Sequence, residues 1–164
     1  MNIRDITLIA ALTAIIFVQE ELLTIIPNVQ LTVFLLVLYS KKVGFKKTSI
    51  IILIHTLLDN LVMGSFNMFY IVFMFIGWMI IPLTLCSIFK NVESNYSLAF
   101  LGILFSFCYC FVYIVPNVVI ADVKFLDYLY ADIIFEVILA MSSFISILLL
   151  YNPISKFLDK FNIC

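Results

Sequence analysis

Long runs of apolar residues, separated by short charged or polar stretches, dominate the chain. Hydrophobic residues make up 65% of the 164 residues, charged residues only 12%, and the mean hydropathy is +1.24. Soluble domains carry roughly 25% charged residues, so a chain this poor in charge is expected in a lipid bilayer. The same composition excludes nucleic-acid binders, disulfide-stapled secreted proteins and disordered chains.

Six apolar segments predict six transmembrane helices, because about 20 apolar residues cross the hydrocarbon core. The segments are residues 6–26, 29–40, 48–62, 68–89, 98–119 and 126–150. The second and third are short, so lysine side chains must snorkel at one end and irregular backbone must complete the other. We therefore expect an all-α polytopic membrane protein, with a single six-span bundle over residues 1–164.

The basic residues orient this bundle. Eight of the nine fall on one side, and only Lys124 falls on the other. The eight are Arg4, Lys41, Lys42, Lys46, Lys47, Lys90, Lys156 and Lys160. Because lysine and arginine gather in cytoplasmic segments, both termini are predicted to be cytoplasmic. Asn152-Pro153 is expected to stop the last helix, and residues 154–164 are expected to form a short interfacial helix on the cytoplasmic leaflet.

Polar side chains inside the predicted spans are candidates for ligand binding, because ionisable groups are costly in lipid. Most fall near the outer half of the membrane by helical rise, and together they predict an outward-facing pocket for a small, flat, polar ligand. The excess of acid favours a ligand with an amine or a ring cation. The candidates are Glu20, His55, Asp59, Asn60, Asn67, Tyr70, Trp78, Tyr109, Tyr113, Asn117, Asp132 and Glu136.

Two features of this set leave alternatives open. His55 and Glu136 both fall near mid-membrane and are possible partners, either in a hydrogen bond that holds the bundle together or in a ligand or proton role. Residues 19–30 contain Gln19, Glu20, Glu21 and Pro27. This segment is either a partly unwound cover over the pocket, or a stretch where one glutamate lies at the headgroups and the other caps a neighbouring helix.

Ala10 and Ala14 form a small-xxx-small ridge on the first helix, suited either to internal packing or to a partner helix. Six short spans with both ends cytoplasmic, this early ridge and an outward polar pocket resemble the S component of energy-coupling factor (ECF) vitamin transporters, their substrate-binding membrane subunit. The stretch 57–65, Leu-Leu-Asp-Asn-Leu-Val-Met-Gly-Ser, and the later Gly77-Trp78 are similar to uncharacterised bacterial members of that family.

The resemblance implies a multi-pass protein of the bacterial cytoplasmic membrane that binds a vitamin or related micronutrient. It also implies that Ala10 and Ala14 contact a membrane T component driven by two cytoplasmic ATPases. By the same analogy, residues 19–30 act as a gate, and the whole subunit topples in the membrane to release its ligand. The sequence holds no GxxxxGK phosphate loop, so any ATP hydrolysis is expected from the partners. We expect no catalytic residue, cofactor, metal site or nucleic-acid partner.

Two other functions were weighed against this one. A self-sufficient secondary transporter or channel, coupled through Glu136 and His55, is the alternative, although no inverted repeat is visible. Glu20-Glu21 followed by His55-xxx-Asp59 also partly resembles intramembrane prenyl-protein endopeptidases, whose pattern begins EExxxR. Here Ile25 stands in place of that arginine and His55 is the only histidine, so a mechanism that needs two histidines is not available.

Overall fold

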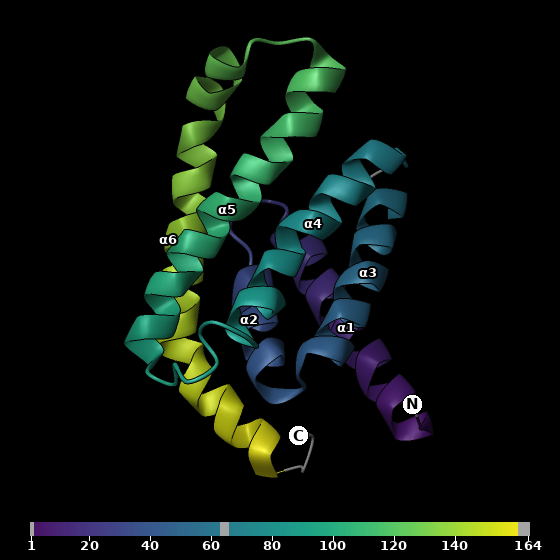
Figure 1. Cartoon of the computed structure of the whole chain (residues 1–164), viewed down its shortest axis with the longest axis vertical. Helices are drawn as coiled ribbons and strands as arrows, with labels where there is room; N and C mark the ends of the chain where they lie inside the picture. Colours follow the sequence, from purple (N-terminus) through teal and green to yellow (C-terminus); the bar gives the residue numbers. More distant parts are fainter. Residues whose placement is uncertain (1, 63–65, 161–164) are drawn as a thin grey trace.

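The computed structural model describes residues 2–62 and 66–160, which fold into six α-helices with no strand in these ranges (Figure 1). The helices are α1 (Ile3–Leu23), α2 (Thr32–Lys42), α3 (Phe45–Val62), α4 (Met68–Leu85), α5 (Asn95–Ala121) and α6 (Phe125–Lys160). Each predicted apolar segment corresponds to one helix, so the all-α prediction is confirmed. The quoted motif residues 63–65 lie outside the described ranges.

Four of these helices, α1, α4, α5 and α6, are long and apolar enough to cross a membrane. They indicate a membrane-embedded protein. α2 has only 11 residues and covers about 16 Å, roughly half of the hydrocarbon thickness. The prediction of six complete spans therefore remains a prediction.

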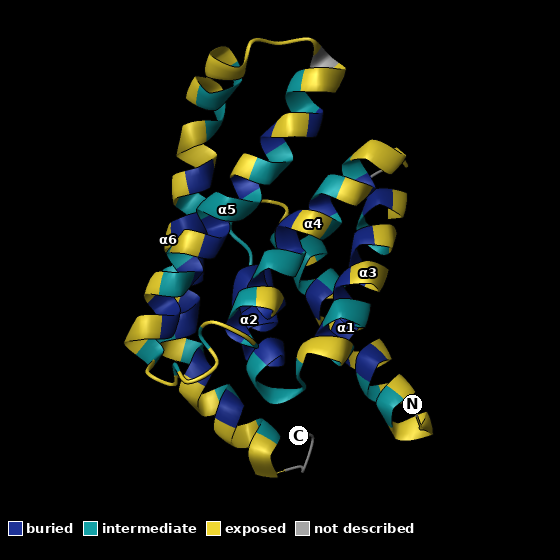
Figure 2. Ribbon diagram, in the orientation of Figure 1, coloured by how far each residue is buried: buried dark blue, intermediate teal, exposed yellow. Residues whose placement is uncertain are grey.

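Burial, not length, stabilises α2. Nine of its residues, Thr32 through Ser40, are buried, and the helix packs against α4, α5 and α6 as well as α3 and α1 (Figure 2). Its sequence carries no charge until Lys41, as expected for a helix that is apolar on every side and enclosed by others. α2 therefore lies at the centre of the bundle, in the lower half of the view in Figure 1.

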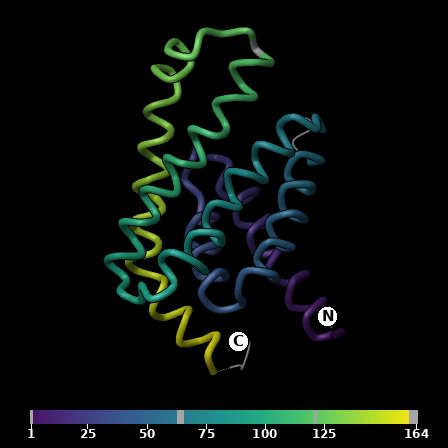
Figure 3. Tube along the Cα trace, viewed as in Figure 1, coloured from purple at the N-terminus to yellow at the C-terminus, as the bar shows by residue number. Residues whose placement is uncertain are grey.

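The other helices form two groups around α2. α5 and α6 make a long antiparallel hairpin on one side, and α1, α3 and α4 lie on the other, as the trace in Figure 3 shows. The first turn of α1 and the last turn of α6 lie at the same end of the bundle, which we call the terminal end.

Two ion pairs tie helix ends together at the terminal end. Lys42 Nζ lies 2.7 Å from Asp159 Oδ1, which joins the end of α2 to the end of α6. Lys47 Nζ lies 2.7 Å from Asp5 Oδ1, which joins the start of α3 to the start of α1. These lysines, at the end of α2 and the start of α3, therefore also hold the first and last helices in place.

The expected helix break at Asn152-Pro153 is wrong. α6 continues through Pro153 to Lys160, although its last turns run at an angle to the rest in Figure 1. A proline inside a helix removes one hydrogen bond and bends the helix, and here the bend does not end it. Residues 154–160 are consequently the last turns of α6, and their position at the membrane interface stays a prediction, while residues 161–164 lie outside the described ranges.

Candidate functional site

A cavity of about 550 Å³ lies away from the terminal end, between α1, α3 and α4 on one side and α5 and α6 on the other. Half of the predicted ligand residues line this cavity. They are Glu20, Asp59, Tyr109, Tyr113, Asn117 and Asp132. The cavity therefore brings together carboxylates from three helices with aromatic and amide groups from a fourth.

The connection between α1 and α2, residues 24–31, covers part of the cavity. Thr24 and Ile26 through Gln30 all contribute to its lining. Of the segment 19–30, predicted as a partly unwound cover, the part from Thr24 onward is non-helical, while α1 stays helical to Leu23. The cover is therefore shorter than predicted, and Glu20 projects from a regular helix.

Hydrogen bonds fasten this connection to its neighbours. Gln19 Nε2 donates to Thr32 Oγ1 at 2.9 Å, and Gln19 Oε1 accepts from the backbone N–H of Leu31 at 2.8 Å. On the opposite side, Ser142 Oγ of α6 donates to the carbonyl of Gln30 at 3.0 Å. The end of the connection is thus held between α1 and α6.

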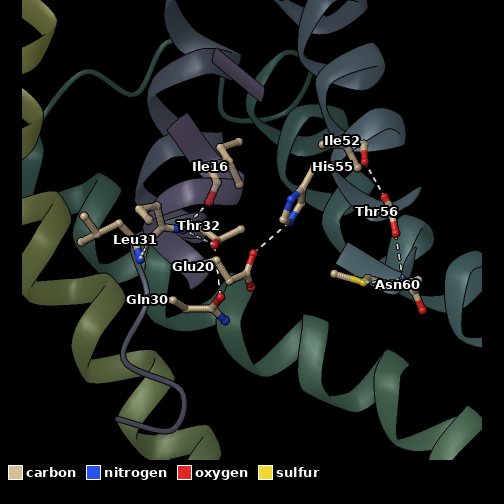
Figure 4. A network of polar contacts seen from close by, with 11 residues as sticks. Ile16, Glu20, Gln30, Leu31, Thr32, Ile52, His55, Thr56 and Asn60 are labelled. Carbon is tan, nitrogen blue, oxygen red and sulfur yellow. Dashed lines mark hydrogen bonds and ion pairs between the residues drawn. The ribbon is translucent and has the colours of Figure 1, made fainter. Parts of the chain in front are cut away.

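Glu20 of α1 meets His55 of α3 beside the cavity. Glu20 Oε2 lies 3.1 Å from His55 Nε2, a contact drawn in Figure 4, and the imidazole is fully buried. The distance is that of an ion pair, but the angles are not those of a hydrogen bond. The predicted partnership of His55 with Glu136 is wrong, because α3 packs against α1 and α4 while α6 packs against α5 and α2.

Glu136 is buried in α6 without a partner. Its side chain is 1% exposed, and neither carboxylate oxygen has a hydrogen-bond partner among the described residues. It shares a helix face with Asp132, four residues before it, and with Leu139, three residues after it, and both of these line the cavity. Glu136 therefore lies beside the cavity wall as an uncompensated acidic group.

A ladder of aromatic rings forms another wall. Trp78 stacks on Tyr109 with ring centroids 3.7 Å apart, and Tyr109 stacks on Tyr113 at 5.5 Å. Tyr70 extends the ladder at 5.8 Å from Tyr113. Gly77 makes this approach possible, because a Cβ there would lie 2.8 Å from the Tyr109 ring. Trp78 and Tyr70 thus support the two cavity-lining tyrosines.

Two predicted ligand residues make local structural contacts instead. Asn60 is buried, and its Nδ2 donates to the carbonyl of Thr56 at 2.9 Å and lies 3.3 Å from the sulfur of Met74. Asn67 caps α4, where its Oδ1 accepts from the backbone N–H of Phe69 at 2.9 Å. Neither side chain lines the cavity.

Several residues that line the cavity were not among the predicted ligand residues. Tyr128 had a usable signal, because it lies four residues before Asp132 and so on the same helix face. Met74, Ile114 and Leu139 had none, since an apolar residue that lines a cavity has the same hydropathy as one in the core.

Ala10 and Ala14 lie on the outer surface of α1. Both are exposed, whereas Ile9, Leu12 and Ile16 on the same helix are buried. The ridge is therefore not used for packing within the described part of this chain, which leaves it open to another helix.

Comparison with known proteins found no matching family model, no matching curated protein and no matching solved structure.

Proposed function

We propose that this chain is the S component of an ECF-type transporter, the subunit that binds a small water-soluble vitamin or related micronutrient for import. The observation that carries the proposal is the polar cavity of about 550 Å³ set into an apolar helical bundle. Binding pockets for small molecules fall in this range of volumes and combine apolar walls with a few polar groups that fix orientation.

The distribution of charge supports an outward-facing cavity. The terminal end holds the first turn of α1, the last turn of α6 and the lysines where α2 ends and α3 begins, and the cavity lies away from it. Because basic residues gather on the cytoplasmic side, this arrangement supports a cavity that opens to the outside of a bacterial cytoplasmic membrane. An importer needs its ligand site to be accessible from there.

The exposed ridge of Ala10 and Ala14 supports a membrane partner. Small residues allow two helix backbones to approach closely in lipid, where packing drives association. In the proposed complex this surface contacts the T component, and two cytoplasmic ATPases supply the energy. The connection of residues 24–31 serves as the gate, and toppling of the subunit releases the ligand inside.

The proposal is tested by Ala14→Trp in cells that carry the T component and the ATPases. A bulky ring on the ridge should prevent close helix approach, so uptake and copurification of the T component are lost while ligand binding by the purified subunit persists. Ile134→Trp on α6 is the control, because Ile134 is 67% exposed on another helix. Loss of both binding and uptake, or of neither, would contradict the proposal.

One observation favours the alternative of a self-sufficient secondary transporter. Glu136 is a buried carboxyl group without a hydrogen-bond partner among the described residues, as expected for a proton carrier. Uptake into liposomes that contain only this chain, driven by a proton gradient and abolished by Glu136→Gln, would establish it. Under the ECF proposal, such liposomes show no concentrative uptake.

A further inference from the structure

The carboxylates at the cavity occupy two separate walls. Glu20 of α1 and Asp59 of α3 lie within electrostatic range of each other on one side. Asp132 and Glu136 of α6 lie within electrostatic range of each other on the other side. α1 and α3 belong to one helix group and α6 to the other (Figure 1), and residues of both groups line the cavity, so the two acidic pairs lie on different helix groups around it.

Aromatic rings lie between these two acidic pairs. Tyr109 and Tyr113 of α5 are within electrostatic range of Glu20 and Asp59. Tyr128, which also lines the cavity, is within range of Asp132. The space between the acidic walls is therefore faced by flat rings, which favour a flat or apolar group stacked against them.

The protein supplies little positive charge to balance these acids. None of the described residues that line the cavity is a lysine, an arginine or a histidine. His55 lies behind Glu20, and on the opposite wall neither oxygen of Glu136 has a hydrogen-bond partner among the described residues. Uncompensated carboxylates are costly away from bulk water, so an occupant that brings positive charge to each wall relieves both.

We propose that the cavity binds a small organic dication, whose two positive groups are joined by a flat or apolar middle. One positive group pairs with Glu20 and Asp59, the other pairs with Asp132, next to the buried carboxyl group of Glu136, and the middle lies along Tyr109 and Tyr113. The inference rests on the proposed function, because it names the chemical class of the ligand at that same site. A singly charged ligand would leave one acidic wall unbalanced.

The test compares matched amines. The full-length chain in detergent is titrated with p-xylylenediamine and with benzylamine, which shares the ring but carries one amine, and likewise with hexamethylenediamine and hexylamine. Fluorescence of Trp78, the only tryptophan, reports binding because its ring stacks on the cavity-lining Tyr109. We expect at least one diamine to bind about tenfold or more tightly than its monoamine, since two charge-assisted pairs replace one.

Variants test whether each carboxylate wall binds one of the two positive groups of the dication. Asp132→Asn and Asp59→Asn should each reduce the affinity ratio of diamine to monoamine toward one. Asp127→Asn should leave the ratio unchanged, because Asp127 is exposed on the same helix as Asp132 and does not line the cavity. Equal affinities for every matched pair in the unmodified chain, or a ratio that persists in Asp132→Asn, overturns the inference.

Failure of this inference is distinguishable from failure of the proposed function. If a neutral or singly charged compound copurifies with the chain and Ala14→Trp still abolishes uptake, the dication is wrong and the transporter proposal stands. If the diamines bind as expected but Ala14→Trp leaves uptake intact, the ligand class stands and the ECF assignment falls.

Discussion

Tyr109 of α5 lies flat against Trp78 of α4, with ring centroids 3.7 Å apart and ring planes inclined by 14°. Tyr109 faces the cavity, whereas Trp78 is fully buried behind it. Any molecule that rests on Tyr109 therefore changes the surroundings of Trp78 without touching it.

This stacking predicts that Tyr109→Leu weakens binding of a cationic aromatic ligand about tenfold, because a stacked or cation–π contact contributes roughly 1–2 kcal/mol. The measurement is a titration followed by calorimetry, since the substitution also alters Trp78 emission. Tyr96→Leu is the control, because Tyr96 lies on the same helix and is 68% exposed. An unchanged affinity in Tyr109→Leu would remove the ring from the site.

Gly77→Ala should displace the Tyr109 ring, because the new Cβ would lie 2.8 Å from it. We expect a loss of about 1–3 kcal/mol in the free energy of unfolding, measured in mixed micelles, together with weaker ligand binding and a shifted Trp78 emission. Gly102→Ala serves as the control. Its Cβ would meet the flexible end of Ile147 at 2.5 Å, away from the cavity, so stability falls without a change in binding or emission.

The contact between Glu20 and His55 predicts energetic coupling. In a double-mutant cycle with Glu20→Gln and His55→Asn, we expect a coupling free energy of about 0.5–2 kcal/mol. The same cycle with Glu136→Gln in place of Glu20→Gln should be additive, because Glu136 lies on the opposite wall. Equal coupling in both cycles, or additivity in both, would show that the Glu20–His55 contact contributes nothing to stability.

Gln19→Ala should loosen the cover of residues 24–31, because it removes the hydrogen bonds to Leu31 and Thr32. We expect amide hydrogen exchange to become roughly tenfold faster in this connection, as each bond of this kind is worth about 1 kcal/mol. Thr24→Ala is the control, since Thr24 Oγ1 bonds only the nearby carbonyl of Glu21. Exchange that accelerates equally in both variants would show that Gln19 does not fasten the cover.

The sequence was sufficient to predict the number and the approximate positions of the helices. An apolar segment in lipid must satisfy its backbone hydrogen bonds internally, and a helix does so. The sequence was insufficient at Pro153 and for the residue at which the cover begins. Proline bends a helix or ends it according to how the following turns pack, and Pro153 is followed by Ser155, which is buried. α1 extends past Gln19 to Leu23, and the Gln19 side chain bonds residues twelve and thirteen positions away, a contact that local sequence patterns do not reveal.

The candidate site was likewise predictable from the sequence only in part. The four-residue spacing of Tyr109 and Tyr113 correctly predicted that they share a helix face. The predicted depth of Glu20, Asp59 and Asp132 in the membrane correctly grouped them, and all three line the cavity. Depth gives height along a helix axis but not which neighbour a side chain faces. For this reason Glu136 was a possible partner of His55 by depth, although the packing of α3 on α1 brings His55 to Glu20.

The shortness of α2 creates the room in which a ligand can lie. No residue of α2 lines the cavity, and its first turn begins where the cover ends, at Thr32. One additional turn at that end would rise about 5.4 Å into the hollow and fill much of it. The largest molecule that this bundle admits is accordingly limited by the reach of a helix that never contacts it.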